Sequence, residues 1–340
     1  MMLFMATEKK RILIVKLSSL GDILHALPAV HCLKNGLDAE IDWIVHPAYA
    51  DLVRCFSDVD RVLKFPRHAS PAEFLLSTRL LRSSSYDYIL DLQGILKSAL
   101  ASRLARGGKR LGPSFQREGS FLFYSAVAGT RNKNRHAVAE LMDFVRHFGL
   151  PEQKAAFPIS VPLQLVGEQS PRVALMPFSR WRSKNWPLMS FARVGRDLRE
   201  NLNAALYIIG GTEDQAQSAE LEKELDGRVI NLAGKTALPQ LAGLLREMDL
   251  VITNDSGPMH LAAGMGAAVL ALYGPTDPVR TGPYGANCRV LSGKLRCQPC
   301  FAARCRFGDN SCMHTITPEA VINAAVEMLS KQGAGRGARN

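Results

Sequence analysis

Residues 11–35 read RILIVKLSSLGDILHALPAVHCLKN and contain a strand, a turn and a helix in direct succession. The β-branched run at residues 11–17 predicts a buried strand, and apolar residues at helical spacing over 22–35 predict the helix. A strand that leads straight into a helix is the first half of a βαβ unit. This stretch therefore predicts an α/β fold with a mainly parallel sheet.

The same alternation runs along the rest of the chain, with one interruption. Further strands are predicted at residues 41–45, 61–65, 88–92, 173–176, 205–209, 229–232, 250–253 and 268–273. Helices are predicted at residues 48–56, 72–82, 95–106, 137–148, 188–200, 213–225, 238–247 and 318–329, the last with Thr317 as its N-cap. Four prolines between 151 and 171 break the rhythm. We predict two doubly wound, Rossmann-like domains facing each other across a cleft, at residues 1–157 and 171–330, joined by a linker at 158–170.

Composition and charge narrow the class of protein. The chain has 340 residues, 47% of them hydrophobic, which is enough for two cores and excludes global disorder. Its apolar runs are too short to span a bilayer, and no secretory signal is recognisable at its start, so we expect a cytoplasmic protein. The glycine-rich, basic residues 331–340 are predicted to be a disordered tail.

The net charge of +11 is concentrated in one place. Residues 97–135 contain nine Lys or Arg residues and one acid, Glu118. Such a run is either a solvated face or a site for an anionic partner. No nucleic-acid-binding motif accompanies it, so no nucleic acid is expected. Within the run, the apolar residues 121–129 predict either a buried helix or a segment that rests against acyl chains.

Two polar turns of the second half follow predicted strands. Residues 253–260, TNDSGPMH, open a helix whose free N–H groups would suit a diphosphate, or Ser256 or Asp255 simply caps that helix. Residues 177–187, PFSRWRSKNWP, offer Arg180, Arg182 and Lys184 to phosphates, or form an exposed loop whose tryptophans merely pack. Strand carboxyl ends line the ligand crevice in such sheets, which favours binding roles for both turns.

In the first half, Asp22 is predicted to start the helix that follows the first strand. Its carboxylate is either an ordinary N-cap or, opposite a phosphate-binding domain, a general base. A general base acts on an acceptor substrate, the molecule whose hydroxyl it deprotonates. The candidate residues for binding such an acceptor are Ser19 and Gly21 in the same turn, with Lys97 and Arg131 of the basic run.

Seven cysteines in a chain without secretory features argue against a disulfide framework. Four of them, Cys297, Cys300, Cys305 and Cys312, lie within sixteen residues. Three interpretations stay open: a structural zinc site, reduced thiols in a loop, or a disulfide in oxidised protein. A catalytic metal is not expected.

Five segments together resemble glycosyltransferase family nine, and within it the lipopolysaccharide heptosyltransferases. They are KLSSLGDILHALPAV at 16–30, DLQGILKSAL at 91–100, SKNWP at 183–187, NDSGPMHLAA at 254–263 and YGPTDP at 273–278. The resemblance spans nearly the whole chain in order and spacing. The first two segments favour type I enzymes, whereas the cysteine segment resembles type II.

The resemblance implies a GT-B fold and inverting, metal-independent transfer from ADP-heptose, without a cofactor. Asp22 matches the family's catalytic aspartate and Lys184 its phosphate-binding lysine. The matching donor contacts are Asp255, Ser256, Gly257 and His260, with Ser179 nearby and Arg180 as a further donor-site candidate. The implied acceptor is a lipopolysaccharide precursor, either Kdo₂-lipid A or a heptosylated core, which would hold the enzyme peripherally at the inner face of the inner membrane. The alternatives are a relative with another sugar or acceptor, as in type II or III enzymes, and a non-catalytic nucleotide-binding module.

Overall fold

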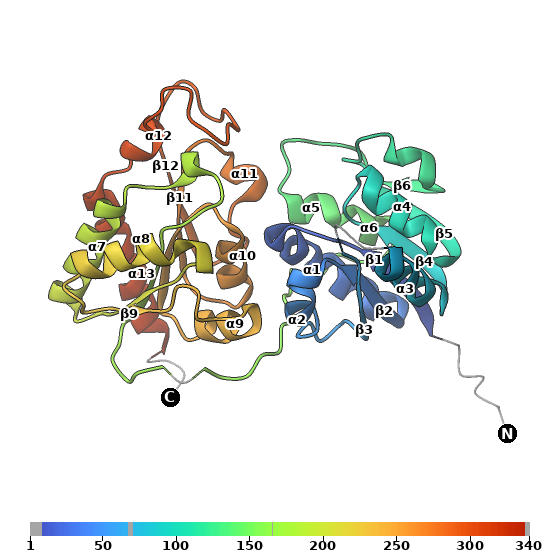
Figure 1. The fold of residues 1–340 in the computed structure, drawn as a ribbon, viewed down its shortest axis with the longest axis horizontal. Coiled ribbons are helices and arrows are strands. Elements are labelled where there is room, and N and C mark those ends of the chain that lie inside the picture. The colour runs from blue at the N-terminus through green and yellow to red at the C-terminus, as the bar shows by residue number, and fades with distance from the viewer. Residues whose placement is uncertain (1–8, 67–70, 165, 337–340) are drawn as a thin grey trace. The chain divides into compact units, whose positions relative to one another are not determined.

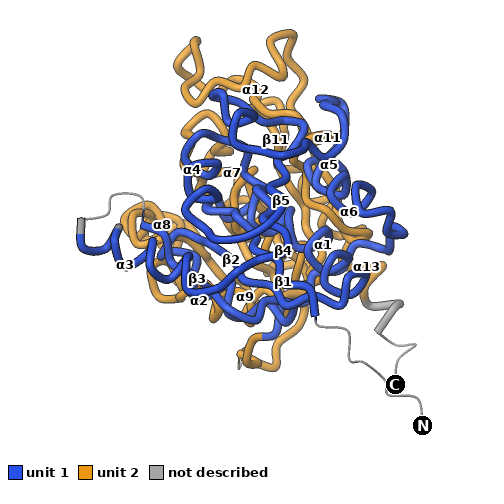
Figure 2. The backbone as a smooth tube through the Cα atoms, turned by 90° about the vertical axis from the view of Figure 1, so that its right-hand side faces the viewer, with its two compact units in different colours: residues 1–160 blue, residues 161–340 orange. Residues whose placement is uncertain are grey.

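The computed structural model describes residues 9–66, 71–164 and 166–336 and resolves two α/β units (Figure 1). The units are Met1–Ser160 and Val161–Asn340 (Figure 2), so the chain passes between them inside the predicted linker. The first linker residues stay with unit 1, because Ile159 bridges to Phe56 and the Ser160 N–H donates to the Cys55 carbonyl at 2.7 Å.

Unit 1 contains a six-stranded sheet in the order β3-β2-β1-β4-β5-β6, with every pair parallel. The strands are β1 Lys10–Val15, β2 Ala39–Val45, β3 Arg61–Lys64, β4 Ser85–Asp91, β5 Arg106–Pro113 and β6 Ala126–Ala128. The helices are α1 Leu20–Leu37, η1 Pro47–Tyr49, α2 Ala50–Val53, α3 Pro71–Arg82, α4 Leu96–Leu104, η2 Ser120–Phe123, α5 Ala137–Leu141 and α6 Asp143–His147.

Unit 2 contains a second parallel six-stranded sheet, in the order β12-β11-β10-β7-β8-β9. The strands are β7 Arg172–Met176, β8 Ala205–Ile208, β9 Ile230–Asn231, β10 Leu250–Asn254, β11 Val269–Tyr273 and β12 Cys288–Ser292. The helices are η3 Arg182–Lys184, α7 Leu188–Leu202, η4 Thr212–Asp214, α8 Gln215–Glu224, α9 Leu238–Arg246, α10 Gly257–Gly264, α11 Pro278–Thr281, α12 Ser311–His314 and α13 Pro318–Arg336.

The central strands are buried on both faces, which is why they read as unbroken apolar runs. Residues Ile12 to Val15 of β1 have no exposed surface, and all five residues of β10 and of β11 are buried. Counted within its own unit, each sheet has the strand order 3-2-1-4-5-6. The order reverses between β1 and β4 and between β7 and β10, and ligands of such sheets bind beyond the carboxyl ends at that point.

Three strands were not predicted from the sequence. Strand β5, with the sequence RGGKRLGP, lacks an apolar period and is exposed over its first four residues. Its glycines serve close strand approach instead, because a Cβ at Gly107, whose φ is +136°, would lie 2.2 Å from the Tyr86 carbonyl oxygen. Strands β6 and β12 are short or half-exposed edge strands, which carry a weak periodic signal.

Several predicted helices differ from the observed ones. The predicted helix at 48–56 is shorter in the structure, where the 3₁₀ turn η1 leads into the four-residue helix α2. The predicted helix at 137–148 divides into α5 and α6. Residues 121–129 form the end of η2 and strand β6 in place of a buried helix. The predicted disordered tail is helical up to Arg336, because α13 continues through residues that a helix accommodates once it has been nucleated. Residues 337–340 lie outside the described residues.

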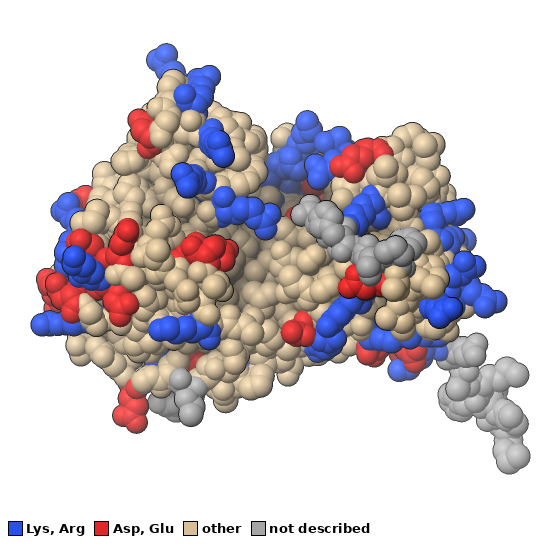
Figure 3. Space-filling view, viewed as in Figure 1, with Lys and Arg blue, Asp and Glu red and all other residues tan. Residues whose placement is uncertain are grey.

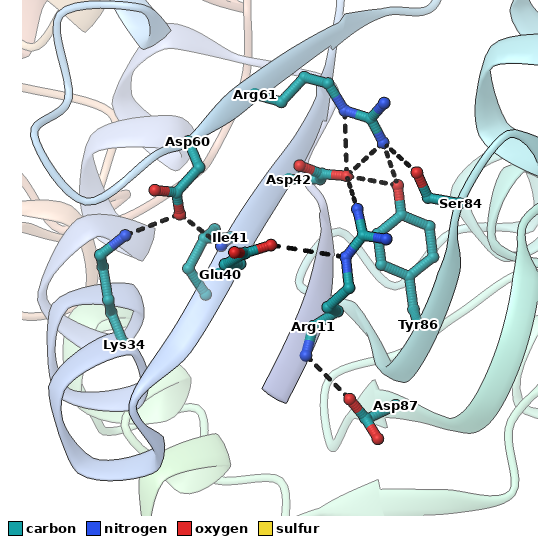
Figure 4. Close-up of polar contacts among 10 residues, drawn as sticks. All are labelled: Arg11, Lys34, Glu40, Ile41, Asp42, Asp60, Arg61, Ser84, Tyr86 and Asp87. Carbon is teal, nitrogen blue, oxygen red and sulfur yellow. Dashed lines mark hydrogen bonds and ion pairs between the residues drawn. The ribbon is translucent and has the colours of Figure 1, made fainter. Parts of the chain in front are cut away.

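A cluster of polar side chains joins strands of unit 1 near their amino ends (Figure 4). The carboxylate of Asp42 on β2 accepts hydrogen bonds from Arg61 Nη2 at 2.6 Å and from the Tyr86 hydroxyl at 2.6 Å. Asp87 accepts from the Arg11 N–H at 2.8 Å. These contacts tie β1 to β4, and β2 to both β3 and β4, at the end of the sheet opposite the switch point.

Candidate functional site

The carboxyl edge of the unit 2 sheet brings together the loops that follow β7, β10 and β11. Asn254, at the end of β10, is completely buried. Its Nδ2 donates to the Pro177 carbonyl at 2.5 Å, and its Oδ1 accepts from the Trp186 N–H at 3.2 Å. Asn254 thereby ties both ends of the loop at residues 177–187 to β10. Trp186 is buried, as the packing interpretation expected.

Asp255 is the centre of this loop cluster. Its carboxylate pairs with Lys184 Nζ at 2.6 Å and accepts from the Thr276 hydroxyl at 2.6 Å. Its carbonyl accepts from the Ser179 hydroxyl at 3.1 Å. The Lys184 side chain is 16% exposed and its ammonium lies 4.6 Å from the centre of the Trp181 ring. Lys184 is therefore a partly exposed cation beside a largely buried polar cluster.

Ser256 lies at the N-cap of helix α10 with Pro258 in the first turn, as the capping interpretation expected, but its side chain makes no capping hydrogen bond. Its hydroxyl is buried with no hydrogen-bond partner among the described residues. The first turn of an α-helix also leaves its N–H groups unpaired inside the helix. A buried hydroxyl that lacks a partner beside such a turn and beside Lys184 is a site for an anionic oxygen.

The predicted donor residues are thus mostly brought together. Ser179, Lys184, Asp255 and Ser256 share this cluster, and Gly257 is the first residue of α10. His260 is buried in the next turn of that helix, whereas Arg180 is exposed. Sequence reasoning assigned no role to Asn254 or Thr276, although both lie in the segments that carried the family resemblance.

In unit 1, Asp22 lies two residues further into the helix than predicted. Helix α1 begins at Leu20 with Ser19 as N-cap, and Asp22 is its third residue. Its Oδ2 accepts from the Ser19 N–H at 2.9 Å and from the Ser19 hydroxyl at 2.8 Å. This reciprocal capping box holds the carboxylate at the carboxyl end of β1. Gly21 is buried in the same first turn.

A second layer fixes the loop before Asp22, and its residues were not predicted. Gln93 Oε1 accepts from the N–H groups of Leu17 and Ser18, both at 3.2 Å. Asp91, fully buried at the end of β4, accepts from the Gln93 N–H at 2.8 Å and from the Tyr124 hydroxyl at 2.7 Å. Burial raises the pKa of the Asp91 carboxyl, and its hydrogen bonds oppose that rise. The available sequence signals were the position of DLQG after a strand and its place in a segment that carried the family resemblance.

Lys16 is a buried cation at the same switch point. Lys16 is 4% exposed, and its Nζ donates a hydrogen bond to the Leu92 carbonyl at 2.7 Å. Burial lowers the pKa of Lys16, while the negative charges of Asp22 and Asp91 oppose that shift. The ammonium therefore contributes positive potential beside the candidate base.

The acceptor candidates Lys97 and Arg131 lie on α4 and in the exposed loop after β6, respectively.

The cysteine segment follows β12 in unit 2. All seven cysteines lie within the described residues and are free thiols. Backbone N–H groups, that of Phe307 foremost, lower the pKa of Cys305, whereas burial raises the pKa of Cys312. Across the described part of the chain, no three His, Cys, Asp or Glu side chains are placed to hold a metal ion. A structural zinc site at Cys297, Cys300, Cys305 and Cys312 stays a prediction.

Comparison with known proteins identifies the family to which the chain is similar. The family model for "Glycosyltransferase family 9 (heptosyltransferase)" matches residues 76–310. Lipopolysaccharide heptosyltransferase 1 of Salmonella typhimurium is 29% identical over 296 residues, which cover 82% of this chain and 92% of that protein. Lipooligosaccharide heptosyltransferase 2 of Campylobacter jejuni is 26% identical over 327 residues, 91% of this chain and 95% of that protein.

The fold is also that of solved heptosyltransferases. The structure of E. coli heptosyltransferase WaaC with ADP superposes with a TM-score of 0.79 at 24% identity, covering 94% of this chain and 99% of that one. E. coli ADP-heptose heptosyltransferase II gives a TM-score of 0.76 at 22% identity, with 95% and 99% covered. Two Rossmann-like units in this arrangement of strands confirm the predicted GT-B class.

Proposed function

The chain belongs to glycosyltransferase family 9, and from this premise we propose that it transfers a heptose from ADP-heptose to the inner core of a lipopolysaccharide precursor. Family membership makes the chain an enzyme and sets aside the non-catalytic binding module. Relatives of both type I and type II are similar to it, so the donor and the acceptor are the parts that we propose.

The observation that carries the proposal is the anion site in unit 2. A nucleoside diphosphate departs only if the charge that develops on it is stabilised. Lys184, the Ser256 hydroxyl and the amides at the start of α10 supply that stabilisation from this chain alone. We therefore propose that the reaction needs no metal ion. The Asp255 carboxylate holds Lys184 in place until the diphosphate arrives.

Asp22 is the proposed general base. Its carboxylate would take the proton of an acceptor hydroxyl, whose oxygen then forms a bond to the anomeric carbon of the heptose. The bond from that carbon to the diphosphate breaks at the same time, and ADP leaves with the electron pair. One displacement inverts the anomeric centre, so no covalent enzyme intermediate is needed. Ser19, Gly21, Lys97 and Arg131 are the proposed acceptor contacts.

Product analysis tests the proposal directly. Purified enzyme is incubated with ADP-heptose, and separately with UDP- and GDP-sugars, on Kdo₂-lipid A and on a singly heptosylated core. Mass spectrometry should show the gain of one heptose with ADP-heptose only, and the acceptor used separates a type I from a type II reaction. Transfer from UDP- or GDP-sugars in place of ADP-heptose would replace the donor assignment.

A further inference from the structure

The exposed apolar side chains of unit 1 gather on one part of its surface. Among the described residues of this unit, every large hydrophobic side chain that is exposed lies between positions 75 and 127. Seven of these side chains belong to three elements, α3, α4 and η2, and are 39–74% exposed. They are Leu75, Leu76, Leu80, Leu96, Leu100, Phe121 and Leu122, which we call the apolar face.

The three elements that carry the apolar face are neighbours. Helix α3 contacts α4, and α4 contacts η2. Figure 1 shows α3 and α4 one above the other on the same side of unit 1. Within the helices, Leu76 and Leu80 are four residues apart, as are Leu96 and Leu100. Each pair therefore forms a stripe along one side of its helix. Soluble proteins rarely leave such stripes in water without a partner for them.

Exposed basic side chains lie on the same elements and next to them in the chain. The exposed basic residues are Arg79 and Arg82 on α3, Arg103 on α4, and Arg106, Lys109 and Arg117 between α4 and η2. The exposed acids on the same three elements, or within five residues of them in the chain, are Glu73, Asp87 and Glu118. Figure 3 shows Lys and Arg side chains spread over the visible surface of unit 1, with Asp and Glu in fewer places. Positive charge on the elements that carry exposed leucines matches a surface that is both apolar and anionic.

We propose that the face formed by α3, α4 and η2 docks on an anionic lipid bilayer. Among the described residues, no helix is long and apolar enough to cross a membrane, so the contact would be made in the plane of the interface. The leucines and Phe121 would enter the boundary between headgroups and acyl chains, and the arginines would contact lipid phosphates. The docking deepens the proposed function, on which it rests for its biological purpose, because it would bring the enzyme to a lipid-linked acceptor.

Vesicle flotation tests the docking without any turnover. Purified enzyme is mixed with vesicles of phosphatidylethanolamine and phosphatidylglycerol, and separately with phosphatidylcholine vesicles. Parent enzyme should float with the anionic vesicles and much less with the neutral ones. The fourfold variant Leu76→Ser, Leu80→Ser, Leu100→Ser, Leu122→Ser should bind at least roughly a hundredfold more weakly, since one fully inserted leucine contributes roughly tenfold.

A matched control comes from unit 2. Leu163, Met189, Val279 and Phe307 are equally exposed large apolar residues outside the face. Changing these four to Ser removes as much exposed apolar surface and should leave flotation unchanged. The triple variant Arg79→Gln, Arg82→Gln, Arg103→Gln should weaken anionic-vesicle binding by about fivefold per residue. It should also flatten the dependence of binding on salt.

The design separates the competing outcomes. Hydrogen exchange of the parent enzyme, with and without vesicles, needs no variant and should show protection at residues 72–82, 96–104 and 120–127. Flotation that is equal for parent and fourfold variant, or protection elsewhere, would overturn the proposal. So would a parent dimer in sedimentation that the variant abolishes while neither floats, since a second copy would then cover the face. The vesicles contain no acceptor, so a failed heptosyl transfer assay leaves this result intact.

Discussion

Asp22 combines two physical roles in the turn after β1. Its carboxylate closes the capping box with Ser19 and is also the proposed base. Replacement by alanine would remove both, with about 1 kcal/mol of helix stability lost along with the cap. Asn keeps an acceptor oxygen for Ser19 and removes only the base, which makes it the cleaner substitution.

We expect Asp22→Asn to lower kcat by roughly 10²- to 10⁴-fold with little change in ADP affinity or melting temperature. Steady-state kinetics, calorimetric titration with ADP and thermal unfolding measure the three quantities. Ser19→Ala separates the cap from the base, because it weakens the cap and keeps the carboxylate. Since Ser19 is also a proposed acceptor contact, this variant should raise the acceptor KM and leave kcat nearly unchanged. A near-normal kcat in Asp22→Asn would remove the base assignment.

Lys184 and Asp255 form a largely buried pair whose disruption should cost stability as well as binding. Lys184→Ala leaves the buried Asp255 carboxylate without its cation, which we expect to destabilise the protein by about 3 kcal/mol. ADP affinity and kcat should both fall, because the ammonium would meet the diphosphate before and during its departure.

The control lies in the same loop. Arg182 is exposed, so Arg182→Ala should change denaturant midpoint and ADP affinity little. In a double variant, Lys184→Ala with Asp255→Asn, stability should recover in part while ADP affinity does not. If ADP binds equally well to Lys184→Ala and to the parent, the phosphate site lies elsewhere.

Lys16 gives the stability of unit 1 a dependence on alkaline pH. Burial lowers its folded pKa below the ordinary 10.5, so the unfolded chain binds more protons between the two values. The stability contribution of Lys16 is therefore fully present above 10.5 and is lost as pH falls through the lowered pKa. The free energy of unfolding of the parent minus that of Lys16→Met should rise with pH in this window, as urea unfolding at several pH values would measure. A flat difference would mean that the pKa of Lys16 is the same in both states.

At the scale of elements, the donor site depends on three loops held at fixed distances from one another. Asn254→Ala removes both hydrogen bonds that tie residues 177–187 to β10 and leaves the buried Trp186 N–H without its acceptor. We expect a loss of about 1–3 kcal/mol in stability and a clear rise in the ADP dissociation constant. Asn231→Ala is the matched control, because Asn231 likewise makes hydrogen bonds, with Glu222 and Ala233, but is the last residue of β9. It should lower stability while leaving ADP affinity unchanged. Equal ADP affinity in both variants would show that Asn254 does not position the site.

The elements themselves were largely predictable, and the exceptions have physical causes. Strands β1, β10 and β11 were found because burial on both faces demands continuous apolar residues. Strand β5 was missed because backbone proximity, and not apolar side chains, places it beside β4. The candidate site was likewise predictable only in part. Lys184 and Asp255 were predicted as separate donor contacts, but periodicity does not reveal that they pair with each other, nor that Gln93 holds the backbone of Leu17 and Ser18.

At the scale of the whole molecule, catalysis is proposed to use charges that the chain itself supplies. Activity should therefore persist after dialysis against EDTA, with kcat changed by less than about twofold, since Lys184 and the α10 amides take the place of a metal at the leaving group. Transfer assays with and without added Mg²⁺ or Mn²⁺ measure this. A strict metal requirement would contradict the proposed mechanism. Elemental analysis of the same sample tests the cysteine segment independently.

The single passage of the chain between its units, at Ser160 and Val161, makes the protein divisible by recombination. A seam at that peptide bond interrupts neither sheet, since every strand of one sheet precedes it and every strand of the other follows it. Halves of two family members joined there would each keep an intact core. Such hybrids would inherit their nucleotide preference from one parent and their acceptor preference from the other. The same joint offers evolution a route to new pairings of the two by gene fusion, without redesign of either half.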